Sequence, residues 1–211
     1  MPAKDITADE FRSLWPSGYR EGWEGAGYSS DIPDKLRRVI YPDYADPYSV
    51  ALDIGCGDGY WTRRLLVPYF GIVHAVDVID KPLLFHNIQK VRYVKLSGYD
   101  LPGFEPDSID FSWSFGCMCH LTNGAVKEYL SAICRVMRPG AHGVIMMANW
   151  ARHPSYKPPA SGYGVDPEPF CRWTCMDAIT AEEHVKGAGL QWLGEAIPGF
   201  RDTLAVVRKP L

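Results

Sequence analysis

The most informative segment of the sequence is Ala51-Leu52-Asp53-Ile54-Gly55-Cys56-Gly57-Asp58-Gly59-Tyr60, followed at residues 74–78 by His-Ala-Val-Asp-Val. An apolar run breaks into a glycine-rich turn, and a second apolar run ends on the carboxylate of Asp77. A buried strand, a glycine turn, a helix and a second strand closed by an acidic residue form the layout of a nucleoside-binding site in an α/β sheet. The sequence therefore predicts such a site here.

The glycine turn argues against a dinucleotide as the ligand. A dinucleotide fingerprint reads G-x-G-x-x-G, and Gly55 and Gly57 fit it, but Tyr60 stands where the third glycine belongs. Asp53 and Asp58 flank the turn, where carboxylates would repel a pyrophosphate and attract a cation. The turn therefore predicts a positively charged nucleoside. S-adenosylmethionine, which carries an ammonium, a sulfonium and a ribose diol but no phosphate, meets this description.

At these residues the sequence resembles the class I S-adenosylmethionine-dependent methyltransferases, whose first motif is an acidic residue followed by G-x-G-x-G. The resemblance continues at Cys119-His120-Leu121 and at residues 135–140, which read R-V-x-x-P-G, and it covers about Val50 to Asn149. More loosely, residues 143–149 and 201–203 are similar to bacterial sugar and small-molecule O-methyltransferase-like proteins.

Composition narrows the class of protein. The chain has 211 residues, of which 46% are hydrophobic and 22% charged, as expected for one globular domain. The net charge is −3 and the basic residues are scattered, so we expect a small-molecule acceptor and no nucleic acid. No apolar run approaches the roughly 20 residues that cross a bilayer, and the first residues lack an apolar secretion segment. We expect a cytoplasmic protein without membrane contact, with a homodimer as an open alternative.

Short apolar runs alternate with helix-like stretches after about residue 47, which indicates an α/β protein with a parallel sheet. The fold class is a single Rossmann-like seven-stranded, mostly parallel sheet with helices on both faces and an antiparallel last strand, which the resemblance also implies. Strands are predicted at Val50–Ile54, Ile72–Asp77, Val91–Leu96, Ile109–Phe115, Gly143–Ala148, Leu190–Ala196 and Thr203–Arg208, and helices at Gly59–Leu66, Pro82–Gln89, Ala125–Met137 and from Thr180.

Two segments differ in composition from the alternating pattern. Residues 1–47 are aromatic and glycine-rich, and form either a leading helix packed on the domain edge or a lid over the cofactor. The resemblance implies that residues 48–211 form the methyltransferase domain. Within it, about 149–169 is rich in proline and polar residues, and a loop this long in a compact domain is typical of either a binding loop or a disordered segment. We expect it to contact the substrate.

The cofactor-binding candidates follow from the glycine turn and the resemblance. Asp77 lies 18 residues beyond Gly59, near the offset at which an acidic strand end meets a ribose diol. The resemblance implies that Asp100 meets the adenine amino group, flanked by Leu101 or Tyr99, and the end of the fourth strand should line the methionine side. The full set is Trp23, Asp53, Gly55, Cys56, Gly57, Asp77, Val78, Asp100, Leu101, Ser114 and Phe115.

Two histidines are candidates for catalysis. Methyl transfer is an in-line displacement, and an alcohol acceptor must lose a proton that a histidine can accept near neutral pH. His120 follows the fourth strand and His153 follows the fifth, and each either acts as a base or only shapes the site. His184 is expected on a helix surface. The six cysteines lack paired C-x2-C spacing, so no metal site is predicted.

The sequence thus favours S-adenosylmethionine-dependent methyl transfer to a small polar acceptor, foremost a hydroxyl of a sugar or natural product. N-methylation of a small amine is an alternative, since an amine needs less help from a base. A third alternative is a non-catalytic methyltransferase-like protein that binds another protein.

Overall fold

The computed structural model describes residues 31–80, 85, 87–153, 155–157, 160–166 and 173–211. Its centre is one seven-stranded sheet in the order β3-β2-β1-β4-β5-β7-β6. The strands are β1 (Val50–Ile54), β2 (Ile72–Asp77), β3 (Val91–Lys95), β4 (Ile109–Ser114), β5 (Met137–Met147), β6 (Gln191–Glu195) and β7 (Thr203–Arg208).

The first five strands run parallel and the last pair forms a hairpin. β1 pairs in parallel with β2 and with β4, β2 with β3, and β4 with β5. β7 is antiparallel to both of its neighbours, β5 and β6. The predicted fold class is confirmed, and the carboxyl ends of β1, β2 and β4 meet at one edge of the sheet, where open α/β folds bind ligands.

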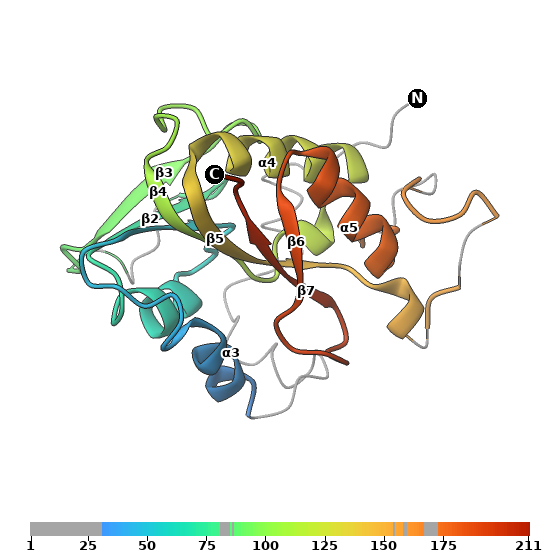
Figure 1. Cartoon of the computed structure of the whole chain (residues 1–211), viewed down its shortest axis with the longest axis horizontal. Coiled ribbons are helices and arrows are strands. Elements are labelled where there is room, and N and C mark those ends of the chain that lie inside the picture. The colour runs from blue at the N-terminus through green and yellow to red at the C-terminus, as the bar shows by residue number, and fades with distance from the viewer. Residues whose placement is uncertain (1–30, 81–84, 86, 154, 158–159, 167–172) are drawn as a thin grey trace.

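Helices cover both faces of the sheet (Figure 1). α3 (Ile32–Ile40) and the π-helical turn η1 (Thr62–Leu66) lie on one side, and α4 (Asn123–Val136) and α5 (Ala178–Gly187) pack together on the other. Two 3-10 turns, η3 (Met118–His120) and η4 (Trp150–Arg152), follow β4 and β5. None of the helices in the described ranges is long and apolar enough to span a membrane.

Side-chain oxygens begin the two longer helices. The Thr122 hydroxyl accepts from the Ala125 amide at the start of α4, and the Asp177 carboxylate accepts from the Thr180 amide at the start of α5. Each oxygen satisfies an amide that has no partner within its helix. Both helices therefore begin two residues earlier than predicted, because the cap lies before the apolar periodicity begins.

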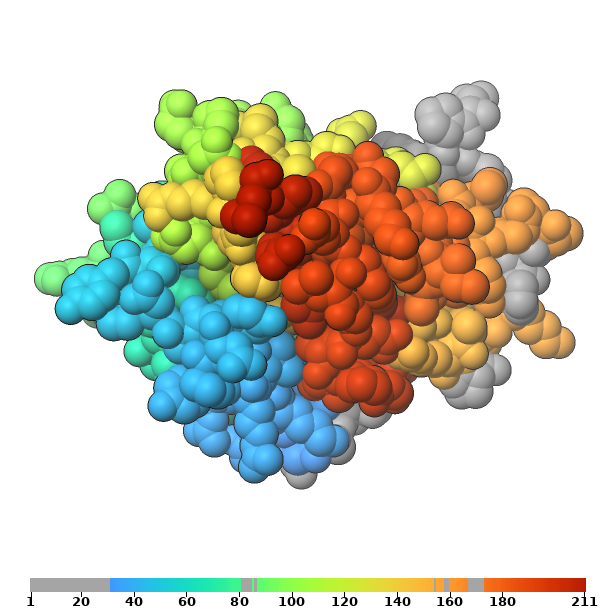
Figure 2. All heavy atoms as spheres, in the orientation of Figure 1, coloured from blue at the N-terminus to red at the C-terminus, as the bar shows by residue number. Residues whose placement is uncertain are grey.

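The segment before β1 packs on the sheet. α3 buries Ile32, Leu36 and Ile40, and the Tyr44 ring stacks on Phe111 of β4 with centroids 5.4 Å apart. This segment and the C-terminal strands form much of the molecular face in Figure 2. Residues 1–30 lie outside the described part of the chain, so the lid interpretation stays a prediction.

β5 begins at Met137, six residues before the predicted start at Gly143. The backbone becomes extended directly after α4, and Met137 pairs with Ile109 before the register shifts. Gly140, at φ +82°, lies within this irregular stretch. The Arg-Pro-Gly sequence at 138–140 is typical of a turn, and only pairing with a strand distant in the sequence makes it part of the sheet.

Candidate active site

The turn after β1 takes a conformation that glycine favours. Gly55 and Gly57 have φ of +71° and +55°. A Cβ on Gly55 would lie 2.2 Å from the Cβ of Cys117, so a side chain is excluded there. A Cβ on Gly57 would meet nothing within 4 Å, so a ligand has room to approach this backbone.

The carboxylate of Asp77 is fixed at the end of β2 by this turn. Its Oδ2 accepts from the Gly57 amide at 2.8 Å and its Oδ1 from the Val78 amide at 2.7 Å. The side chain is 6% exposed, yet it borders the pocket described below. Its remaining lone pairs can accept from the two hydroxyls of a ribose diol.

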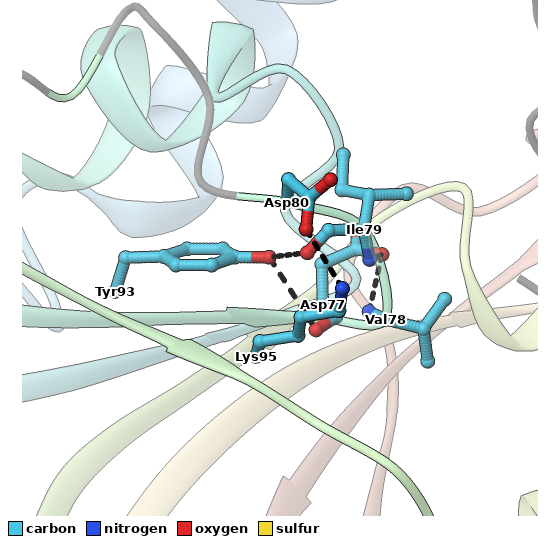
Figure 3. Close-up of polar contacts among 6 residues, drawn as sticks. All are labelled: Asp77, Val78, Ile79, Asp80, Tyr93 and Lys95. Carbon is cyan, nitrogen blue, oxygen red and sulfur yellow. Dashed lines mark hydrogen bonds and ion pairs between the residues drawn. The ribbon is translucent and has the colours of Figure 1, made fainter.

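Side chains of β3 hold the segment that follows Asp77 (Figure 3). The Tyr93 hydroxyl donates to the carbonyl of Ile79 and, at 3.4 Å, to that of Asp77. Lys95 pairs with the exposed carboxylate of Asp80 at 2.7 Å. The segment that bears Asp77 and Val78 is therefore fixed from the neighbouring strand before any ligand binds.

A second carboxylate lies beneath the turn. Asp53 of β1 is 2% exposed and accepts from the Thr62 hydroxyl at 2.5 Å. Burial raises the pKa of Asp53 to about 7. The hydrogen bond from Thr62 acts to lower this pKa, and the negative charge of Asp77 acts to raise it. Burial also raises the pKa of Asp77, against hydrogen bonds from three backbone amides. Among the described residues neither carboxylate has a basic partner, so a cationic ligand would be attracted here.

One pocket joins the turn to the segment after β4. It brings together the glycine turn, the carboxylate of β2, a histidine of η3 and two tyrosines. The lining residues are Gly55, Gly57, Asp77, Val78, Tyr99, Gly116, Cys117, His120, Leu121 and Tyr129.

Several predicted cofactor residues are not among those that line this pocket. Ser114 is fully buried and donates to the Ile54 carbonyl at 3.0 Å, which joins β4 to β1. Phe115 packs edge-on against Trp61 with ring centroids 5.4 Å apart. Cys56 is buried too, and burial raises the pKa of its thiol. Like Asp53, these residues do not line the pocket, and their contact with a cofactor stays a prediction.

The residues predicted to contact adenine, Asp100 and Leu101, do not line this pocket. Leu101 is fully buried, while Asp100 is exposed and borders a separate surface groove with Lys127 and Arg135. The Arg135 guanidinium donates to the carbonyls of Asp100 and Leu101, both at 3.0 Å. Their contact with adenine stays a prediction. Trp23 lies outside the described residues.

The two histidines predicted to act in catalysis, His120 and His153, differ in their position relative to the pocket. His120 lines the pocket, and its ring packs edge-on against Trp173 at 4.7 Å between centroids. His153 is not among the pocket residues, accepts from the Ser155 amide at 3.3 Å and packs against Tyr156. The structure therefore brings His120 and not His153 to the cofactor turn.

A row of contacts extends from His120 away from the pocket. The Arg201 guanidinium lies 5.1 Å from the centre of the Trp173 ring. The same guanidinium donates to the Asp202 carboxylate at 2.7 and 2.9 Å, and that side chain is 1% exposed. Trp173 is thus held between the pocket histidine and a neutralised arginine.

Sequence reasoning missed four of the lining residues. Gly116, Cys117 and Leu121 follow β4, and Gly116 has φ of +76°. A glycine directly after an apolar strand was a usable signal for a turn at the ligand edge. Tyr129 gave no such signal, because helical periodicity places it on a buried face without showing that this face reaches a cavity.

Part of the chain matches a known protein family. Residues 52–145 match the family model described as a methyltransferase domain. Over these residues the chain is similar to methyltransferase domains. The match includes both carboxylates, the glycine turn and the segment that carries His120.

Two curated relatives match this chain over part of their length. The N-terminal Xaa-Pro-Lys N-methyltransferase 1 of Ailuropoda melanoleuca is 31% identical over 154 residues, which cover 70% of this chain and 64% of that relative. The enzyme of the same name from Bos taurus is 36% identical over 105 residues, which cover 47% of this chain and 46% of the relative. The chain thus spans less than two thirds of the length of these relatives.

Solved structures share the fold of the methyltransferase domain. A methyltransferase in complex with the Haloferax volcanii Trm112 methyltransferase activator has a TM-score of 0.71 at 15% identity, covering 96% of this chain and 98% of that one. Burkholderia thailandensis 1,6-didemethyltoxoflavin-N1-methyltransferase, with bound S-adenosylhomocysteine, has a TM-score of 0.68 at 20% identity, covering 100% and 94%. At these identities the likeness is one of fold.

These findings confirm the resemblance to class I methyltransferases and support the enzyme class and the S-adenosylmethionine cofactor that it implies. The prediction of a small molecule as the partner is contradicted. The similar curated enzymes are named for an N-terminal Xaa-Pro-Lys sequence, and a structural neighbour was solved bound to another protein. The names also specify N-methylation, so the preference for a sugar hydroxyl is not supported.

Proposed function

We propose that this protein transfers a methyl group from S-adenosylmethionine to the amino group at the N-terminus of a peptide or protein. The observation that carries the proposal is the Asp77 carboxylate, fixed by the Gly57 amide at the rim of a pocket that also holds His120. The N-methyltransferase relatives supply the class of acceptor.

The cofactor half of the site suits a sulfonium donor. Asp77 is placed to accept from the ribose diol, and the open backbone at Gly57 admits close approach of the ligand. The buried carboxylates of Asp53 and Asp77 attract the positive charge. Methyl transfer removes the charge from sulfur, so this attraction weakens for the product and favours its release.

The acceptor half needs a group that receives a proton. An amino terminus has a pKa of about 8, so most of it is protonated at pH 7 and its lone pair is unavailable for attack. His120 lies in the same pocket as the glycine turn and can accept that proton before the nitrogen attacks the methyl group. The Trp173 ring holds the histidine from the side.

A peptide series tests this function. The protein is incubated with isotopically labelled S-adenosylmethionine and peptides that begin Xaa-Pro-Lys, and the products are located by tandem mass spectrometry. We expect label on the N-terminal nitrogen, and none on the same peptide with an acetylated N-terminus. A panel of sugars and phenols is run in parallel. Methylation of an alcohol with no reaction of the free peptides would overturn the proposal.

Two matched variants test the role of the histidine. His120→Ala should lower kcat/KM for the best peptide by about 100-fold, the lower range for loss of a general base. His153→Ala should stay within about twofold of the wild type, because His153 does not line the pocket. Equal losses in both variants would contradict the assignment.

A further inference from the structure

We propose that the Tyr129 hydroxyl is a further ligand-binding group, which donates a hydrogen bond to a ring nitrogen of the cofactor's adenine. The inference rests on the proposed function and makes it more specific. It assigns selection of the base to a side chain of α4, in addition to the loops at the strand ends.

Tyr129 is buried, polar and directed at a cavity. It is 3% exposed and lines the same pocket as Asp77 and His120. Its ring has one ring partner among the described residues, Tyr99, edge to face with centroids 5.0 Å apart. Within the same residues the Tyr129 hydroxyl has no hydrogen-bond partner. The hydroxyl is not one of the described side-chain atoms that are sealed from solvent without a partner, so it is accessible from the pocket, where a ligand can accept its hydrogen bond.

The position of Tyr129 in the pocket points to the base of the nucleoside. When Asp77 accepts from the ribose, the base extends from the sugar toward the residues next to Asp77 in the pocket. The same pocket presents Val78 and the contacting rings of Tyr99 and Tyr129, an apolar side chain and two aromatic rings suited to a flat heteroaromatic ligand. Adenine carries acceptor nitrogens in its rings, and a phenol is a suitable donor to them.

The hydroxyl is present as a donor at every pH at which the protein works. Burial raises the pKa of Tyr129 well above its ordinary value, and the charges of Cys117, Asp77, Tyr99 and Asp100 act in the same direction. The proton therefore stays on the oxygen, and an acceptor on the ligand is required to use it.

Calorimetry with S-adenosylhomocysteine tests the inference on the full chain. Tyr129→Phe keeps the ring and removes only the hydroxyl, and we expect about 3- to 10-fold weaker binding, as for one neutral hydrogen bond. Tyr44→Phe is the matched control, because Tyr44 stacks on Phe111 and does not line the pocket. This control should bind as the wild type does.

Deaza analogues of S-adenosylhomocysteine, each with one ring nitrogen replaced by carbon, identify the partner atom. For one analogue the difference between wild type and Tyr129→Phe should vanish, since the two changes remove the same hydrogen bond. The wild-type series alone keeps the test valid if the variant folds poorly, because one analogue should then bind more weakly than the others.

Three results would overturn the inference. One is equal affinity of wild type and Tyr129→Phe for S-adenosylhomocysteine. Another is a raised peptide KM with unchanged cofactor affinity, which would place the hydroxyl on the acceptor side. The third is a wild-type protein that does not bind S-adenosylhomocysteine at all, and only this result would also overturn the proposed function.

Discussion

Asp77 performs two tasks with one side chain, because its carboxylate holds the glycine turn and also faces the pocket. Asp77→Asn keeps the shape but removes the charge and replaces one acceptor oxygen by a donor. We expect affinity for S-adenosylmethionine to fall by about 10- to 100-fold, the range for loss of hydrogen bonds to a charged group. Isothermal titration calorimetry measures this.

Asp80→Asn is the control for that experiment. Asp80 lies three residues further along the same loop, its side chain is 82% exposed, and its partner is Lys95. The same chemical change there should leave the affinity within about twofold of the wild type. Equal weakening in both variants would show that Asp77 acts only through the general negative potential of this loop.

Asp53 makes stability depend on pH in an unusual direction for a carboxylate. Its pKa is raised to about 7, so between about pH 4 and pH 7 the folded state binds more protons than the unfolded state. The free energy of unfolding therefore decreases as pH rises through this window, by at most about 1.4 kcal/mol per pH unit for this one group. Asp53→Asn, which retains an acceptor for the Thr62 hydroxyl, should flatten this dependence.

Urea unfolding of both proteins at pH 5, 6, 7 and 8 gives the comparison. The difference between wild type and Asp53→Asn isolates the carboxylate from the histidines, which titrate in both proteins. Parallel stability curves for the two proteins would contradict the assignment of the raised pKa to Asp53.

At the scale of elements, one hydrogen-bonded cluster joins the long loop after β5 to both helices of one face. Asp166 of this loop accepts from the Asn123 backbone and side-chain amides at 2.7 and 2.8 Å and from the Cys175 amide at 3.3 Å. The Asn123 side-chain oxygen lies 2.8 Å from Nε2 of His184 on α5. The loop predicted to contact the substrate is thus attached to the start of α4.

Removing this attachment should affect the acceptor more than the cofactor. Asp166→Ala leaves amides of Asn123 and Cys175 without an acceptor, so we expect a loss of about 1–3 kcal/mol in stability. We also expect a severalfold higher KM for the peptide, with little change in affinity for S-adenosylhomocysteine. Steady-state kinetics and hydrogen exchange over residues 160–166 measure both effects. Asp34→Ala, on the exposed side of α3, is the control, and an unchanged peptide KM in Asp166→Ala would separate the loop from acceptor binding.

Elements were predictable from the sequence where the signal is local. The run from Val50 to Asp77 predicted two strands, the turn and both carboxylates, because apolar alternation and glycine act on neighbouring residues. The early start of β5 was not predictable, since it depends on pairing with Ile109. His184, expected on a helix surface, is 7% exposed, and its Nε2 lies 2.8 Å from the side-chain oxygen of Asn123, a residue distant in the sequence.

The same limit holds for the site. His120 and His153 follow neighbouring strands at similar offsets, and the sequence gives no reason to prefer one. The structure separates them, because His120 of η3 lines the pocket together with Gly55, whereas His153, which follows η4, is not among the lining residues. The same limit applies to Tyr129, since helical periodicity predicts that this residue is buried and does not show that the buried face borders a cavity.

For the whole molecule, ligand binding separates an enzyme from a methyltransferase-like protein that has lost its cofactor. A ligand at 100 times its Kd that binds only the folded state adds about 2.7 kcal/mol to its stability. For a chain of this length that corresponds to a rise in Tm of about 5–10 °C. We expect this rise with S-adenosylhomocysteine and a much smaller one for Asp77→Asn at the same concentration. NADH is the control ligand, because a pyrophosphate would be repelled by the two buried carboxylates and should leave the Tm unchanged. A wild-type Tm that does not respond to millimolar S-adenosylhomocysteine would favour a binding protein that retains the fold without the reaction.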